Sequence, residues 1–178
     1  MTMITLKGKT ILVADTNVQD FPTPERLIKV SKSCVRIARL FGFDPKVAFL
    51  SHSTFGKPIS KNTKHVRDAI ELLKKEKFDF DFDGEMQPDV ALNPIYQDVY
   101  PFSKIVGNAN ILIMPALHSA AISTKLMKVF GGGKLIGPLL IGLGSPIEVA
   151  PLRASTSEIL NLASIAAYSS DVIDYKKN

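Results

Sequence analysis

The sequence lacks the features that mark secreted and membrane proteins. Its 178 residues include one cysteine, Cys34, so an intrachain disulfide is impossible and a reducing, cytoplasmic compartment is expected. No apolar run reaches the roughly 18 residues of a membrane span, because the nearest one, at 135–143, is short and contains Gly137 and Pro138. The first residues show no basic segment followed by an apolar block, so we expect no secretory signal and no membrane partner.

Several catalytic signatures are missing as well. The three histidines, His52, His65 and His118, have no metal-ligand spacing, so no metal site is predicted, and His65 is expected to be solvated. Where a nucleophile elbow would have serine, the chain has Leu143, which argues against a serine hydrolase. The glycines at 131–133 follow a helical pattern instead of joining a strand to a helix, so they do not predict a dinucleotide site.

The charge balance is basic but diffuse. Net charge is +5, and the lysines are scattered along 57–77 and at the C-terminus without an arginine-rich stripe. A solvated face is therefore the favoured interpretation, with no nucleic-acid partner, although the charge also suits a small anionic ligand. Hydrophobic residues make up 46% and charged residues 22%, which is typical of one globular domain with a buried core.

Short apolar runs alternate with helical patterns along the chain. Such alternation predicts an α/β domain of three layers, α/β/α, with a mostly parallel sheet. Residues 1–178 are read as one domain, with 175–178 as a frayed tail. Strict alternation at 78–83 predicts a strand near a sheet edge, and 135–149 is read as strand-rich. Strands are also expected at 10–15, 47–51 and 111–115, and helices at 23–42, 61–76, 86–92, 119–130 and 155–170. Cys34 is read as a small core residue of the first helix.

Ligands on such sheets bind beyond the carboxyl ends of the strands, which directs attention to the loops at 51–60, 83–89, 115–119 and 151–155. The first loop offers the hydroxyls of Ser51, Ser53 and Thr54, which can cradle a phosphate or simply form a hydroxyl-rich turn. The second brings together Asp83, Glu85 and Asp89. These carboxylates could serve acid–base chemistry or a cation, but the favoured interpretation is that Glu85 and Asp89 cap the following short helix.

Four segments occur in the order found in one known family. V-A-F-L-S-H-S-T-F-G at 47–56, D-G-E-M-Q-P-D-V-A at 83–91, G-N-A-N-I-L-I-M-P at 107–115 and G-P-L-L-I-G-L at 137–143 resemble the phosphate acetyl/butyryl transferases. The resemblance extends from about residue 10 to 167. Residues 15–18 and 115–122 look more like the transferase-like domain at the C-terminus of large bacterial malic enzymes.

The resemblance implies both a fold and a catalytic pattern. It implies the later lobe of a two-lobed domain, similar to the second lobe of isocitrate and isopropylmalate dehydrogenases. The family's catalytic Asp falls on Glu158, its Ser and an adjacent Arg fall on Pro151 and Leu152, and a further Arg falls on Val129. Since guanidinium groups hold the acyl phosphate, these replacements predict a defect in transfer, for which Arg153 is the nearest substitute.

The resemblance also suggests a function. It implies a non-catalytic module that responds to acetyl-CoA and assembles a malic enzyme, whose catalytic domains would belong to the parent chain, as a homodimer or higher homo-oligomer. The alternative is an active phosphate acetyltransferase that moves acetyl groups between CoA and phosphate. No covalent cofactor is expected, and CoA or acetyl-CoA is the expected ligand. Its cleft is expected to include Ser51, Ser53, Thr54, Arg153 and Ser155.

Overall fold

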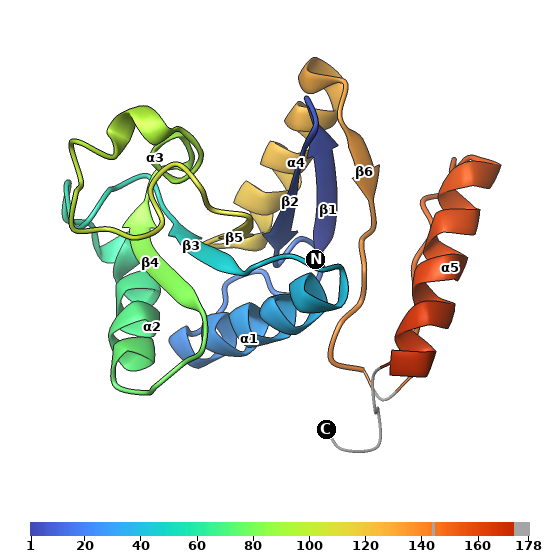
Figure 1. The fold of residues 1–178 in the computed structure, drawn as a ribbon, viewed down its shortest axis with the longest axis horizontal. Coiled ribbons are helices and arrows are strands. Elements are labelled where there is room, and N and C mark those ends of the chain that lie inside the picture. The colour runs from blue at the N-terminus through green and yellow to red at the C-terminus, as the bar shows by residue number, and fades with distance from the viewer. Residues whose placement is uncertain (144, 173–178) are drawn as a thin grey trace.

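The computed structural model describes residues 1–143 and 145–172, and its centre is a six-stranded sheet in the order β4-β3-β5-β2-β1-β6 (Figure 1). The strands β2, β3, β4 and β5 run parallel, whereas β1 is antiparallel to both β2 and β6. The predicted mostly parallel sheet is therefore confirmed. The strands are β1 Thr2–Leu6, β2 Lys9–Ala14, β3 Lys46–Leu50, β4 Asp81–Met86, β5 Ile111–Ile113 and β6 Lys134–Ile136.

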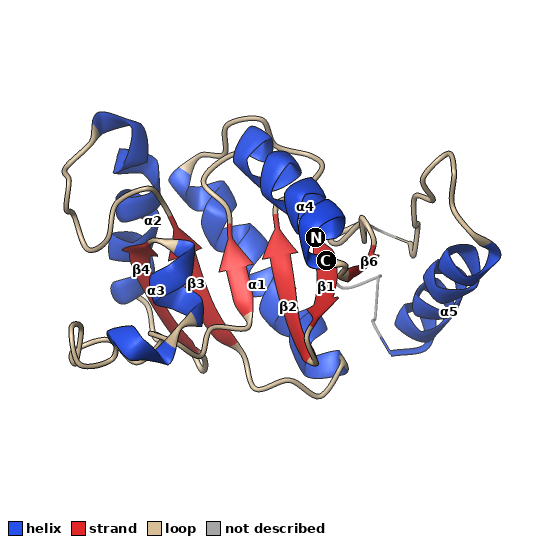
Figure 2. Ribbon diagram, turned by 90° about the horizontal axis from the view of Figure 1, so that it is seen from above, coloured by secondary structure: helices blue, strands red, loops and turns tan. Residues whose placement is uncertain are grey.

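Helices cover both faces of the sheet, which confirms the three-layer prediction (Figure 2). One face packs against α1 and α2, and the other against α3, α4 and the segment between α3 and β5. The α-helices are α1 Pro24–Leu40, α2 Lys64–Lys74, α3 Pro88–Leu92, α4 Leu117–Gly131 and α5 Thr156–Val172, and short 3-10 helices occupy Lys61–Thr63 and Pro94–Tyr96.

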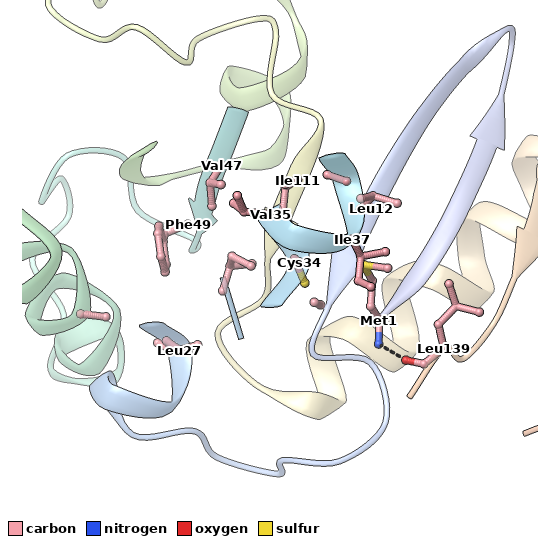
Figure 3. Packing of buried hydrophobic residues seen from close by; sticks show 14 of the residues in the cluster. Met1, Leu12, Leu27, Cys34, Val35, Ile37, Val47, Phe49, Ile111 and Leu139 are labelled. Carbon is pink, nitrogen blue, oxygen red and sulfur yellow. Dashed lines mark hydrogen bonds between the residues drawn. The ribbon is translucent and has the colours of Figure 1, made fainter. Parts of the chain in front are cut away.

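The two cores follow from the period of two residues along a strand. In β3, Val47 and Phe49 face the α1–α2 core, while Ala48 and Leu50 face the opposite one. All four are buried, as expected for a strand covered on both sides. Cys34 lies inside the α1–α2 core, which confirms its predicted structural role (Figure 3).

Helix α1 begins and ends where local sequence signals predict. The Thr23 hydroxyl accepts a hydrogen bond from the Arg26 amide at 3.3 Å, and Pro24 occupies the first helical position. Gly42, at φ +77°, follows the last turn in the left-handed conformation that glycine adopts without strain.

Three strand predictions differ from the structure. The strand expected at 78–83 lies at Asp81–Met86, although it does form a sheet edge. Strand β1 was not predicted, and it pairs with β2 across a turn in which Lys7 and Gly8 have positive φ. The segment at 135–149 is mainly irregular, with β6 and one bridge between Leu139 and Glu148. Gly137 and Pro138 interrupt the strand there, since proline has no N–H for the ladder.

Helix α5 lies beyond β6, at the end of the sheet opposite β4 (Figures 1 and 2). Leu162 is buried and Ile165 packs against the α1–α2 core, while most of the other described side chains of α5 are exposed. The predicted tail at 175–178 lies outside the described residues. Within the described ranges, no helix has the length and apolar character needed to cross a membrane.

Candidate functional site

The loop after β3 lies where a parallel sheet offers a ligand site, at the carboxyl ends of β3 and β4. The Ser51 amide donates to the Met86 carbonyl at 3.0 Å, so the loop starts in register with the end of β4. Thr54 and Lys57 then exchange two backbone hydrogen bonds of 3.0 and 3.1 Å. The two residues between them, Phe55 and Gly56, both have positive φ, which gives a tight and well-bonded turn.

A buried carboxylate, that of Glu85 in β4, accepts hydrogen bonds from this loop. Glu85 is 1% exposed, and its Oε1 accepts from Ser53 Oγ at 2.7 Å and from the Gly56 amide and Arg67 Nη1 at 3.2 Å each. The prediction that Glu85 caps α3 is therefore wrong. Strand β4 continues through Met86, so Glu85 belongs to the strand, and Gln87 is the residue that precedes the helix.

The other two carboxylates of this segment have local roles. Asp89 lies in the first turn of α3, as predicted, and accepts from the Tyr96 hydroxyl at 2.9 Å. Asp83 accepts from the Gly84 amide at 2.9 Å. Over the ranges that the structure describes, no group of three or more histidine, cysteine, aspartate or glutamate side chains is arranged to hold a metal ion.

The predicted ligand residues of the first loop are all buried. Ser51 and Ser53 share a hydroxyl–hydroxyl contact of 3.1 Å, and Thr54 Oγ1 accepts from the Gln87 amide at 3.2 Å. Direct contact of these hydroxyls with a ligand stays a prediction. The exposed side chains of the loop are those of His52, Lys57, Pro58 and Ile59, of which only His52 and Lys57 are polar.

Two histidines, His65 at the start of α2 and His118 at the start of α4, contact residues of neighbouring loops. His65 Nε2 lies 2.8 Å from the carbonyl oxygen of Pro115, and the Phe21 ring lies 5.7 Å from the His65 ring and 6.2 Å from the His118 ring. His65, which was predicted to be solvated, is half-buried, and one of its ring nitrogens has a backbone partner. The loop after β5 brings the Pro115 carbonyl within reach of α2, a contact that depends on how helix and sheet pack.

The residues assigned through the family resemblance lie elsewhere, around α5. Glu158 and Pro151 line a small hollow together with Leu135, Ile136, Gly137, Asn161 and Leu162. Glu158 also completes a capping box at the start of α5. Its Oε2 accepts from the Ser155 amide at 2.7 Å and from the Ser155 hydroxyl at 2.9 Å, and its own amide donates to that hydroxyl at 3.3 Å.

The hydrogen bonds of this capping box affect the pKa of the Glu158 carboxyl. The hydrogen bond from the Ser155 amide, followed by that from the Ser155 hydroxyl, lowers the pKa of the Glu158 carboxyl below its ordinary value. Lys128 lies 3.9 Å away. Val129, Leu152 and Arg153 are exposed, with Val129 at 75% and Leu152 fully accessible.

The structure does not bring the two groups of predicted residues together. Strands β5, β2 and β1 lie between β3, which carries the Ser51 loop, and β6, which adjoins Glu158. At about 4.8 Å per strand, four steps separate the groups by roughly 19 Å across the sheet. Within each group the residues are close. Ser51, Ser53 and Thr54 form one cluster, Pro151, Ser155 and Glu158 form another, and Arg153 follows the second cluster in sequence.

Sequence reasoning did not predict that Glu85 and Arg67 pair with each other and bond to the loop at 51–60. The available signal was a single glutamate in the apolar end of a strand, Gly84-Glu85-Met86, because an ionisable group at such a position requires a buried partner. Arg67 carries a weaker signal. It is half-buried and lies next to the apolar face of α2, which buries Val66, Ala69, Ile70 and Leu73.

Comparison with known proteins gives a consistent assignment. The family described as Phosphate acetyl/butaryl transferase matches residues 1–167. An NADP-dependent malic enzyme of Rhizobium meliloti is 46% identical over 162 residues, which cover 91% of this chain and 21% of that protein. A phosphate acetyltransferase of Clostridium acetobutylicum is 35% identical over 157 residues, covering 87% of this chain and 47% of that protein.

Solved structures agree with the fold. A phosphotransacetylase from Streptococcus pyogenes has a TM-score of 0.88 at 30% identity, and the match covers 96% of this chain and 54% of that one. The chain thus spans about half the length of the phosphotransacetylases it matches and about a fifth of the malic enzymes.

Proposed function

Because the chain belongs to the phosphate acetyl/butyryl transferase family, we propose that it is the later lobe of a phosphotransacetylase-like domain that regulates and assembles an NADP-dependent malic enzyme. Its proposed ligand is acetyl-CoA or CoA. In this proposal the malic-enzyme catalytic domains belong to the parent chain, which is consistent with the chain covering 21% of the Rhizobium protein. Oxidation of malate is assigned to those domains and not to this lobe.

The observation that carries the regulatory role is the absence of a guanidinium group at the two described positions, Val129 and Leu152, that the family resemblance assigns to arginine. Among the described residues, no lysine, arginine or histidine lines the hollow that contains Glu158 and Pro151, and the neighbouring cation, Lys128, lies 3.9 Å from the Glu158 carboxylate. Val129 and Leu152 stand where the family resemblance places arginines. An acyl phosphate carries negative charge that must be neutralised as the transition state forms, and hydrocarbon side chains supply no hydrogen-bond donor for this. Binding of a thioester such as acetyl-CoA does not require the same two guanidinium groups.

The state of Glu158 supports the same conclusion. A general base is most effective when its pKa lies near the working pH, but the Ser155 hydrogen bonds lower the pKa of Glu158. The carboxylate is therefore a weak base for the thiol of CoA. It is also occupied as the acceptor of a capping box.

An active phosphate acetyltransferase is the second candidate, and the observation that favours it is that Glu158 keeps a carboxylate at the catalytic Asp position. The experiment that separates the two candidates measures acetyl-CoA formation from acetyl phosphate and CoA, together with acetyl-CoA binding by calorimetry. The full chain is compared with Glu158→Ala, and with Glu71→Ala as a control because Glu71 is an exposed partner of Lys74 on α2. We expect binding without turnover. Turnover that is lost in Glu158→Ala and kept in the control would overturn the regulatory role.

The assembly part of the proposal is supported by exposed apolar side chains on the two C-terminal helices. On α4, Ile122, Leu126, Val129 and Phe130 are 50–85% exposed and follow helical spacing along one face. On α5, Ile159 and Leu160 are 50% and 61% exposed. We propose that these faces bury each other in a homodimer.

Light scattering tests the assembly. We expect the mass of a dimer for the unaltered chain and of a monomer for Leu126→Glu. The control is Lys125→Glu, a charge change at the neighbouring exposed position of the same helix. A monomeric mass for the unaltered chain at high micromolar concentration would refute the assembly proposal.

A further inference from the structure

One buried carboxylate has no place in the function proposed so far. Glu85 is the second-last residue of strand β4, and its side chain bonds to the loop at 51–57. We infer that Glu85 is a positioning residue, which holds that loop in the shape that an acetyl-CoA or CoA ligand requires. The ligand part of this inference rests on the proposed function, and the loop part rests on the contacts alone.

Glu85 contacts three residues of the loop, Ser53, Phe55 and Gly56. Its carboxylate accepts from Ser53 Oγ and from the Gly56 amide, and its backbone carbonyl accepts from the Phe55 amide at 2.7 Å. Removing the carboxylate would therefore release both sides of the turn at Phe55 and Gly56, where φ is positive in both residues. A turn of this kind persists because its surroundings hold it.

Arg67 extends the same support to the far end of the loop. Its Nη1 donates to Glu85 Oε1 at 3.2 Å and to Thr63 Oγ1 at 2.6 Å, while Nη2 donates to the Ser60 carbonyl at 2.7 Å. The ion pair thus connects the turn with residues 60–63, which lead into α2. Since Glu85 is 1% exposed and the Arg67 side chain 27%, water competes weakly for this pair.

The direction of the hydrogen bonds fixes what the loop can offer. A carboxylate only accepts, so Ser53 must donate its hydroxyl proton to Glu85 and can then accept from the Ser51 hydroxyl. The Ser51 oxygen accepts in turn from the Ser53 amide at 3.2 Å. The hydroxyl protons of Ser51 and Ser53 are consequently used inside the loop, so an anionic ligand would meet the exposed His52 and Lys57 side chains instead of these two hydroxyl groups.

The test compares the full chain with Glu85→Gln, which keeps the shape but removes the charge, and with Glu85→Ala. Glu71→Gln on α2 is the control, because it removes an exposed carboxylate with no contact to the loop. The measurements are amide hydrogen exchange, resolved by segment, and acetyl-CoA affinity by calorimetry. We expect exchange at 51–60 to rise about tenfold in Glu85→Gln and more in Glu85→Ala, with α1 and β2 unchanged, and affinity to fall about tenfold.

Other results of these measurements would overturn the positioning role or the proposed function. Unchanged exchange at 51–60, or a uniform rise over the whole chain, would overturn the positioning role, since the second pattern is that of a purely structural residue. Increased loop exchange with unchanged affinity would also overturn it. If the unaltered chain binds neither acetyl-CoA nor CoA, the proposed function fails, while the exchange measurement still decides whether Glu85 holds the loop.

A milder variant keeps the inference testable if the Glu85 variants do not fold. Ser53→Ala removes one of the three carboxylate contacts and leaves the ion pair with Arg67 in place. We expect the same local rise in exchange at 51–60 with a smaller amplitude. No change in that segment would overturn the inference.

Discussion

Replacing Gly84 with alanine should destabilise the fold strongly, because Gly84 lets β4 approach β3 closely. A Cβ at this position would lie 2.6 Å from the Phe49 carbonyl oxygen, 3.1 Å from Phe49 Cβ and 3.3 Å from Ile70 Cδ1. The first contact is with backbone in the middle of the sheet, so no side-chain rotation relieves it. The φ of +144° adds conformational strain for any residue with a Cβ.

The expected cost combines these two effects. Strain at an unfavourable φ costs about 1–3 kcal/mol, and overpacking of a buried contact costs about the same. Gly84→Ala should therefore lose about 4 kcal/mol of unfolding free energy. For a chain of this length that corresponds to a fall in Tm of about 8–16 °C, because each kcal/mol shifts Tm by about 2–4 °C.

A matched substitution separates strain from overpacking. Gly42 also has a positive φ, +77°, but a Cβ there meets nothing within 4 Å, so Gly42→Ala should cost only about 1 kcal/mol. Scanning calorimetry of the two variants measures the difference. Equal shifts in Tm, or a shift below about 3 °C for Gly84→Ala, would refute the argument that the approach of β4 to β3 is set by this glycine.

Three further predictions follow from single side chains. Ser155→Ala removes the hydroxyl of the α5 capping box, so it should cost about 1 kcal/mol and let the pKa of Glu158 rise toward its ordinary value, as NMR titration would detect; an unchanged pKa would contradict this. Burial raises the pKa of Glu148 to about 7, so the folded state holds a proton that the unfolded state has lost, and stability should fall as pH rises from about 4.5 to 7. Chemical denaturation should show this fall in the unaltered chain and much less of it in Glu148→Gln. Burial also raises the pKa of the Cys34 thiol to about 12, so a thiol reagent should modify it only as fast as the chain unfolds, and rapid labelling of the native chain would contradict its burial.

The exposed apolar surface of α4 and α5 shows where sequence patterns were least informative. Both helices are rich in apolar residues around much of their circumference, and the sequence predicts their positions within about two residues. Their composition alone does not say which side is covered by the sheet. The structure shows that α4 buries Ala120 and Thr124 and leaves Leu126, Val129 and Phe130 exposed.

The sequence by itself determined the layered α/β fold, the caps of α1 and α5, the buried role of Cys34 and the family. These features depend on residues close together in the chain or on ordered motifs, so local periodicity and capping chemistry are enough to predict them. Only the tertiary structure decided that Glu85 supports a loop instead of capping a helix, because its partner Ser53 is 32 residues away and meets it through the pairing of β3 with β4. The separation of the Ser51 loop from Glu158 was likewise invisible in the sequence, since strand order, not chain order, places β5, β2 and β1 between them.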